Sequence, residues 1–337
     1  MMKMRHKEKR YDIRMKAFVT GGTGFIGSHL VDALLEDPEV AQVRCLVRRR
    51  PKWLQNKPVE FVKGDLFDLP AMTRGMEGAD VVFHNAATLQ APDAASFEHV
   101  NVQATESIVR IAARSGVRRL VVLSSLAAAG PSGSEPRTEA DPMEPITAYG
   151  RSKMLMEQRI REIAPAGLQI TILRPPAVYG PREEQIFSYF KLAKYRLSPM
   201  LGRPETGISM VHVADLVQGI RLAGNFGDGG VDTFFLSGPE VVSWPRIRRA
   251  TDAAFGRRSL ALWIGPGTVR RLATVVERSA GLFGAYPVFN REKASELVQQ
   301  WTCDHEKAVR VLGYRPAIDL EPGIRSTIDW YRRHYWL

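Results

Sequence analysis

Short apolar runs rich in β-branched residues alternate with helical patterns along the first half of this chain. The apolar runs lie at 17–20, 43–47, 59–62, 81–84, 120–123 and 170–173, and the helical patterns include 25–36, 96–115 and 149–163. Runs in which apolar residues do not alternate with polar ones are typical of strands in a parallel sheet that is buried on both faces. Strand and helix in alternation predict right-handed βαβ units and an α/β fold built on a doubly wound parallel sheet.

A glycine-rich segment follows the first predicted strand, where residues 20–27 read TGGTGFIG. Glycine at these spacings permits a tight turn, close approach of the backbone to a pyrophosphate and close packing of helix on strand. The start of the next helix offers free N–H groups and a positive dipole end to phosphate. The segment therefore predicts a Rossmann-type dinucleotide site. Its expected cofactor-binding residues are Gly21, Gly24, Phe25, Ile26 and Gly27.

The end of the second predicted strand distinguishes the two nicotinamide cofactors. Residues 45–50 read CLVRRR, without the Asp or Glu that accepts hydrogen bonds from the adenosine ribose in NAD-binding chains. A guanidinium group suits a 2′-phosphate through its charge and its bidentate geometry. We expect Arg48 to bind NADP, with NAD as the alternative cofactor and a solvated basic loop as the alternative interpretation of 48–50.

Tyr149 and Lys153 lie four residues apart in a predicted helix and so project from the same face. An ammonium close to a phenol stabilises the phenolate, which lowers the pKa of the tyrosine toward the range where proton transfer is useful. Alone this spacing is common by chance. The dinucleotide signals that precede it favour a catalytic pair.

Taken together, these residues resemble the extended short-chain dehydrogenase/reductase family from Met15 onward. Further segments similar to the family's motifs follow in order: GDL at 64–66, VFHNAA at 82–87, NV at 101–102, LSS at 123–125, RPPAVYGP at 174–181 and VHVAD at 211–215. The resemblance implies an adenine-contacting turn and cofactor-lining strand ends. The residues concerned are Asp65, Leu66, Asn85, Ala86, Ala87, Pro176 and Val178.

The resemblance also implies a catalytic triad of Ser125, Tyr149 and Lys153. Ser125 is preferred to Ser124 because it lies five residues before Gly130, the family's spacing. In reduction, Tyr149 would donate a proton to the carbonyl oxygen while Ser125 bonds that oxygen. Lys153 would hold the nicotinamide ribose and lower the pKa of the tyrosine.

The residues after the catalytic hydroxyl favour one branch of the family. They read LAAAG, whereas the family's dehydratases carry acidic residues there and its sugar epimerases end in VYG. The pattern resembles the branch of 3β-hydroxysteroid dehydrogenases and dihydroflavonol reductases. It implies an NADP(H)-dependent oxidoreductase that interconverts a secondary alcohol and a ketone on an apolar, steroid-, flavonoid- or lipid-like molecule.

Two other functions stay open. A nucleotide-sugar 4-epimerase would retain tightly bound NAD and anchor a diphosphate, for which four basic residues are available. A non-catalytic NAD(P)-binding regulatory or assembly protein is the alternative from another class. The basic residues are Arg182, Lys191, Lys194 and Arg203.

The 337 residues predict a basic, disordered extension at 1–14, a Rossmann domain at 15–180 and, at 181–337, mainly a substrate lobe with segments returning to the first domain. The net charge of +11 is unaccompanied by any nucleic-acid-binding signature, so we expect no nucleic-acid partner. Neither the two cysteines nor any His or carboxylate cluster has metal-site spacing, so no disulfide and no metal is expected. The charged N-terminal run lacks an apolar centre and predicts a cytoplasmic protein.

Apolar residues recur at helical spacing over 269–283. Packing over the substrate lobe is one interpretation. A peripheral membrane contact is the other, because Arg270, Arg271 and Arg278 flank the apolar stripe. The family resemblance further implies a homodimer through the helices at 96–115 and 149–163. The apolar positions are Val269, Leu272, Ala273, Val276, Ala280 and Phe283.

Overall fold

The structure is a computed structural model that describes residues 14–227, 229–281, 287 and 290–337. All but the last residue of the predicted basic extension lie outside the described residues.

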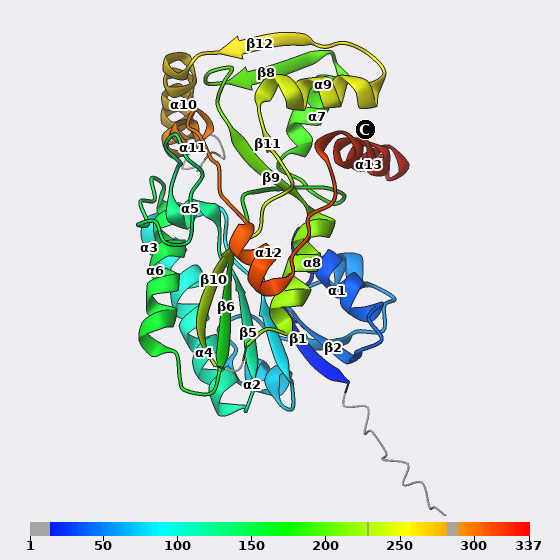
Figure 1. Cartoon of the computed structure of the whole chain (residues 1–337), viewed down its shortest axis with the longest axis vertical. Helices are drawn as coiled ribbons and strands as arrows, with labels where there is room; N and C mark the ends of the chain where they lie inside the picture. Colours follow the sequence, from blue (N-terminus) through cyan, green and yellow to red (C-terminus); the bar gives the residue numbers. More distant parts are fainter. Residues whose placement is uncertain (1–13, 228, 282–286, 288–289) are drawn as a thin grey trace, which may run out of the picture.

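A seven-stranded parallel sheet forms the centre of the lower half of the molecule (Figure 1). Its strand order is β10-β6-β5-β4-β1-β2-β3, and every pairing within it is parallel. All six predicted strands are present, and β10 adds a seventh that the sequence patterns did not reveal. The prediction of a doubly wound α/β fold is confirmed. The strands are β1 (Met15–Thr20), β2 (Val40–Val47), β3 (Glu60–Lys63), β4 (Val81–His84), β5 (Arg119–Leu123), β6 (Gln169–Arg174) and β10 (Gly230–Phe235).

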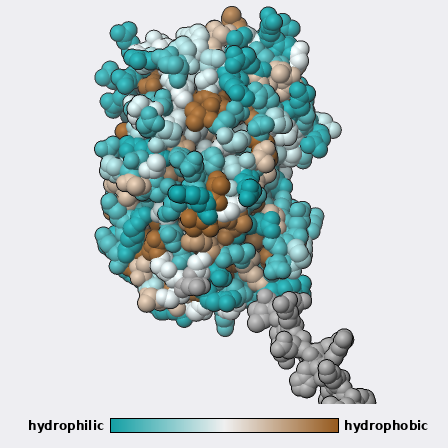
Figure 2. All heavy atoms as spheres, in the orientation of Figure 1, coloured by the Kyte–Doolittle hydropathy of each residue, from teal (hydrophilic) through white to brown (hydrophobic). Residues whose placement is uncertain are grey.

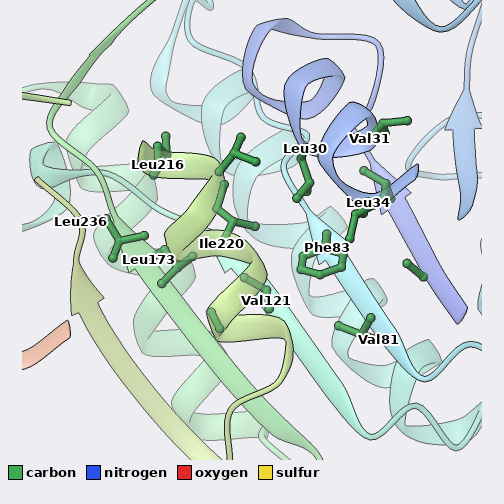
Figure 3. Close-up of a cluster of buried hydrophobic side chains, with 14 of the residues drawn as sticks. Leu30, Val31, Leu34, Val81, Phe83, Val121, Leu173, Leu216, Ile220 and Leu236 are labelled. Atoms are coloured by element: carbon green, nitrogen blue, oxygen red, sulfur yellow. The ribbon is translucent and has the colours of Figure 1, made fainter. Parts of the chain in front are cut away.

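Helices cover both faces of this sheet because its strands carry apolar side chains on both sides. One face packs under α1 (Phe25–Leu35), α8 (Val213–Gly224) and α12 (Glu306–Leu312), and Figure 3 shows Leu30, Phe83 and Ile220 meeting there. The other face packs under α2 (Leu69–Met76), α4 (Ala104–Arg114) and α6 (Ala148–Ile163). Successive residues of β1 enter opposite cores, Phe18 on the second face and Val19 on the first.

The helix predicted at 96–115 is divided in the structure. It begins as α3 (Ala94–Glu98), continues through a π-helical turn at His99–Gln103 and ends as α4. Such turns replace the regular hydrogen-bond ladder locally and are frequent at functional sites. The short helix α5 (Leu126–Ala129) follows β5.

The upper lobe is built on two small sheets. Strands β11 (Val241–Val242), β9 (Ile208–His212) and β7 (Ala177–Tyr179) form one sheet, and β8 (Leu197–Leu201) pairs with β12 (Leu260–Ile264) in the other. An aromatic core joins α7, α9 and α13, where Phe187 and Trp336 pack on Tyr331. The helices of the lobe are α7 (Phe187–Lys194), α9 (Trp244–Phe255), α10 (Pro266–Gly281), α11 (Arg291–Leu297) and α13 (Leu320–Arg333).

Only part of the apolar stripe predicted near 269–283 faces the protein. Val269 and Ala273 on α10 are buried, whereas Leu272 and Val276 are 48% and 39% exposed. Phe283 and the side chain of Ala280 lie outside the described residues. No helix in the described part of the chain is both long and apolar enough to cross a bilayer.

Candidate active site

The glycine-rich turn between β1 and α1 forms a cradle that side chains would fill. Gly21 adopts φ +72°, and a Cβ there would lie 2.6 Å from the backbone nitrogen of Ala86. A Cβ on Gly27 would lie 2.2 Å from the carbonyl oxygen of Gly21. Gly24 stands at the N-cap of α1, where no side chain caps the first free N–H groups. Phe25 and Ile26 form the first turn of that helix.

The end of β4 lies against this cradle. Asn85, Ala86 and Ala87 follow the strand, and the buried Nδ2 of Asn85 has no hydrogen-bond partner within the described residues. A buried amide of this kind needs an acceptor. The tight glycine cradle, the free N–H groups of α1 and this unpartnered donor together fit a dinucleotide.

The remaining predicted cofactor residues lie near the ends of neighbouring strands. Arg48 follows β2, is exposed, and forms no ion pair with a described carboxylate. Asp65 follows β3, and its Oδ1 accepts hydrogen bonds from the amides of Phe67 and Asp68 at 2.9 and 3.1 Å, which holds the turn that contains Leu66. Pro176 and Val178 lie beyond β6, one just before β7 and one within it.

Tyr149 and Ser125 meet near the carboxyl end of β5. Tyr149 lies in the first turn of α6, which begins there because the Thr147 side chain accepts a hydrogen bond from the amide of Gly150 at 3.0 Å. Ser125 caps α5, its Oγ accepting from the amide of Ala127 at 3.1 Å, and its side chain lies beside the hydroxyl of Tyr149. The structure therefore brings the two predicted hydroxyls together.

The pKa of the phenol differs from the sequence-based expectation. Burial raises the pKa of Tyr149 above its ordinary value, the bond with Ser125 opposes this, and the Glu296 carboxylate adds to it. Lys153 does not lower the pKa, because its Nζ donates to the carbonyl oxygen of Leu123 at 2.7 Å. Burial lowers the pKa of Lys153 itself to about 8, partly offset by Glu157.

A buried polar network behind the triad was not predicted. The Glu157 carboxylate accepts from Ser124 Oγ at 2.6 Å and from Arg174 Nε and Nη2 at 2.9 and 2.7 Å. Glu157 is fully buried and Arg174 nearly so. The pairing leaves Ser124 committed to structure, which separates its position from that of Ser125. Glu157 follows Lys153 by four residues, and that spacing was the one sequence signal for it.

Asn101 joins the π-helical turn to the site. Its Oδ1 accepts from the amide of Thr88 at 2.9 Å, and its Nδ2 donates to the Thr88 carbonyl and to Ser152 Oγ at 3.2 and 3.0 Å. The side chain thus satisfies backbone groups beside β4.

Two histidines near the site are held in structural positions. His84 bonds Thr20 and Thr105 through its two ring nitrogens, and burial with the nearby Lys153 lowers its pKa to about 3. His212 caps α8 by accepting from the amide of Ala214 at 3.2 Å, and burial, followed by His29, lowers its pKa to about 4. Both are neutral at pH 7 and do not fit a general acid or base there.

A cavity of about 500 Å³ lies between α3, α6 and the α10–α11 region, and Ala148, the residue before Tyr149, lines it. Phe97 of α3 lines it and packs 6.1 Å from the Tyr149 ring. Its opposite wall is polar. There Glu292 of α11 accepts from the amide of Ala148 and from Arg151 Nη2, each at 2.8 Å. The two lobes therefore meet at the first turn of α6, a contact that no sequence pattern predicted.

Known proteins share this fold and this order of elements. The model of the NAD dependent epimerase/dehydratase family matches residues 17–233. The ceramide reductase of Caulobacter vibrioides is 30% identical and the alignment covers 97% of each chain. The putative dihydroflavonol 4-reductase of Synechocystis is 31% identical, with 94% of each chain covered. The structure of the dTDP-glucose 4,6-dehydratase DesIV from Streptomyces venezuelae, with NAD and TYD bound, superposes with a TM-score of 0.77 at 26% identity, covering 96% of this chain and 98% of that one.

Proposed function

This chain belongs to the NAD dependent epimerase/dehydratase family and is an NAD(P)-dependent oxidoreductase of the extended short-chain type; from that premise we propose that it interconverts a secondary alcohol and a ketone on an apolar, lipid-like molecule, with NADP(H) as cofactor. One observation carries the proposal. The Ser125 side chain lies beside the hydroxyl of Tyr149, and buried Lys153 follows Tyr149 by one turn of α6.

The chain's own groups supply binding and proton transfer. A bound nicotinamide cofactor provides or accepts the hydride. In reduction, Tyr149 donates its proton to the ketone oxygen while Ser125 donates a hydrogen bond to the same oxygen; oxidation starts from the Tyr149 phenolate, which receives the proton of the alcohol. The glycine cradle and Asn85 would hold the dinucleotide, and Lys153 the ribose next to the nicotinamide. The raised pKa of Tyr149 keeps the phenol protonated at neutral pH, as a general acid requires.

The preference for NADP is supported by Arg48. Its exposed guanidinium follows β2 without a carboxylate partner in the described part of the chain, and no acid ends that strand. A 2′-phosphate adds charge that only such a cation stabilises. The Arg48→Ala variant is therefore expected to weaken NADPH binding and to leave NADH binding unchanged.

An apolar substrate is supported by one wall of the cavity, by the buried residues that follow Ser125 and by the relatives. Ala91, Pro92 and Phe97 line one side, and the residues of α5 that follow Ser125 are all buried and apolar. One full-length relative is named for a lipid, ceramide. A nucleotide diphosphate fits less well. Arg182, one of the four basic residues available to bind it, already donates hydrogen bonds to Ser28 and Asp32 on α1 at 3.0 and 2.8 Å.

We further propose that the enzyme is a homodimer in which α4 and α6 pack against the same helices of a second copy. The two helices lie side by side on one face of the sheet and are joined by the ion pair of Arg159 with Glu106 at 2.7 Å. Sedimentation equilibrium of the purified protein tests this directly, and a monomer at assay concentration would contradict it.

The function is tested by turnover with NADPH and NADH on a panel containing a 3-ketosteroid, a dihydroflavonol and a long-chain lipid ketone. We expect oxidation of NADPH with at least one of these ketones and a loss of about 10²–10⁴-fold in kcat for Tyr149→Phe. Tyr195→Phe is the matched control, since Tyr195 is 72% exposed.

Other results would favour the alternatives. Stoichiometric NAD retained through purification, with epimerisation of a UDP-sugar, would identify a nucleotide-sugar epimerase. Cofactor binding without turnover on either class of substrate would identify a regulatory or assembly protein. Unchanged turnover in the Tyr149→Phe variant would contradict the mechanism.

A further inference from the structure

The end of the upper lobe carries an unusual share of the exposed apolar residues. Figure 1 shows α10, β8 and β12 at this end, opposite the start of β1. Figure 2, in the same orientation, shows mainly hydrophilic residues with separate apolar patches. The residues that concern us, here called the distal surface, are Leu197, Leu260, Leu262, Leu272, Val275 and Val276, and all six are exposed.

Strand alternation and pairing place the first three of these residues on one face. Leu197 on β8 is the register partner of Leu260 on β12, and Leu262 lies two residues further along the same strand. The residues that alternate with Leu197 on β8, Ser198 and Met200, are buried against the other side. The open face of this two-stranded sheet is therefore apolar.

Helix α10 continues the same face. Leu201 and Ile264, at the far ends of β8 and β12, point to the same side of the sheet as Leu197 and Leu260. Both pack against a buried cluster that includes Val269 and Ala273 of α10. The next positions around the helix are Leu272, Val275 and Val276, and Val275 is 62% exposed. One apolar surface thus runs from the sheet onto the helix.

Basic residues without carboxylate partners surround this surface. The two segments that contain it, 187–205 and 256–281, hold nine Lys and Arg residues and two Asp or Glu residues. None of the nine cations forms an ion pair in the part of the chain that the structure describes, and Glu277 is paired with Arg291. The cations are Lys191, Lys194, Arg196, Arg203, Arg257, Arg258, Arg270, Arg271 and Arg278.

We propose that the distal surface binds the surface of an anionic lipid bilayer. Apolar side chains flanked by unpaired guanidinium and ammonium groups match an interface in which acyl chains lie beneath anionic phosphates. A second copy of the chain is a poorer occupant, because a symmetric contact would place the same unpaired cations against one another.

The position of α10 links this surface to the cavity between α3 and α6. Glu277 of α10 lines the cavity that also borders Ala148, the neighbour of Tyr149. One helix therefore contributes both to the proposed membrane contact and to the wall of this cavity. Bilayer binding goes beyond the proposed function and is measured without substrate, so failure of one does not imply failure of the other.

Flotation of the full-length protein with vesicles tests the proposal. We expect binding to vesicles of phosphatidylcholine mixed with phosphatidylglycerol, and weaker binding to phosphatidylcholine alone or at high salt. Each Arg at such a surface contributes about fivefold, so the combined Arg270→Gln, Arg271→Gln and Arg278→Gln variant should bind the mixed vesicles about a hundredfold more weakly. The combined Leu272→Ser and Val275→Ser variant should also lose binding.

A charge-matched variant is the control. Arg74, Arg310 and Arg315 are exposed and lie on α2, on α12 and just after α12, against the seven-stranded sheet and away from the distal surface, and their replacement by Gln should leave binding unchanged. Urea unfolding at an unchanged midpoint shows that each variant is folded. No binding by the wild type, equal binding by all variants, or an equal loss in the control would overturn the proposal. So would self-association that the Leu272→Ser and Val275→Ser variant abolishes without any vesicle binding by the wild type.

Discussion

Replacing Lys153 by methionine should make the protein more stable at neutral pH while reducing its activity. Burial lowers the pKa of Lys153 from 10.5 to about 8, with Glu157 offsetting part of the effect. At about 1.36 kcal/mol for each pKa unit, holding the ammonium in this position costs about 3 kcal/mol of folding free energy. Methionine is of similar length and carries no charge. It would leave the Leu123 carbonyl without its 2.7 Å hydrogen bond, a loss of about 1 kcal/mol. We therefore expect a net gain of about 2 kcal/mol.

The pH dependence of this gain identifies its cause. Because the folded-state pKa lies below the unfolded one, the unfolded chain binds more protons between pH 8 and 10.5. In the wild type, the free-energy cost of burying the Lys153 ammonium is fully present below about pH 8 and disappears as the pH rises toward 10.5. The advantage of Lys153→Met should accordingly be largest at pH 7 and should shrink through this window.

Urea unfolding of both proteins at pH 7, 8.5 and 10 measures this difference. Lys63→Met is the matched control, since Lys63 on β3 is exposed and should show no such trend. A Lys153→Met variant that is less stable than the wild type at pH 7, or a difference that does not change with pH, would refute the reasoning. It would mean that the bonds of the ammonium outweigh its burial.

Three further predictions concern the cradle, the buried network and the cofactor. Gly27→Ala should raise the KM for the cofactor at least about tenfold, because its Cβ would lie 2.2 Å from a backbone oxygen and the loop must move. Gly133→Ala is the control, since its Cβ would meet no atom within 4 Å and the KM should not change. Arg174→Met should lower the free energy of unfolding by about 3 kcal/mol, because the buried Glu157 carboxylate would keep only the longer ion pair with Arg161 at 3.4 Å, and adding Glu157→Leu should recover most of the loss in urea unfolding. Arg48→Ala should weaken NADPH binding in a fluorescence titration by about tenfold or more, the worth of a charge-assisted hydrogen bond, with NADH binding unaffected.

The fold was predictable because its signals are local. Each of the six predicted strands is a short apolar run, and the turn at Gly21 is recognisable because only glycine adopts its backbone conformation without strain. β10 was missed because it follows the irregular upper-lobe segment and joins β6 across a long connection. The division of the helix at 96–115 was missed as well, since no proline or glycine marks the π-helical turn.

The site was predictable to the level of helical spacing and no further. The four-residue interval of Tyr149 and Lys153 places them on one helix face. The direction of the Lys153 ammonium, however, depends on its hydrogen bond to the Leu123 carbonyl of β5, far away in the sequence. Glu157 pairs with Arg174 for the same tertiary reason. Which of two adjacent serines faces the phenol is likewise decided by packing, because Ser124 turns toward Glu157.

The contact of Glu292 with the first turn of α6 has a consequence for how this enzyme can change. The carboxylate comes from the upper lobe, 144 residues along the chain from the amide of Ala148 that it holds. A substitution on α11 that alters the choice of substrate is therefore also expected to affect the first turn of α6, which carries Tyr149. We therefore expect a change in substrate range to change the rate of proton transfer as well. When a lobe is exchanged between this chain and a relative, Glu292 should be kept together with its partners Ala148 and Arg151.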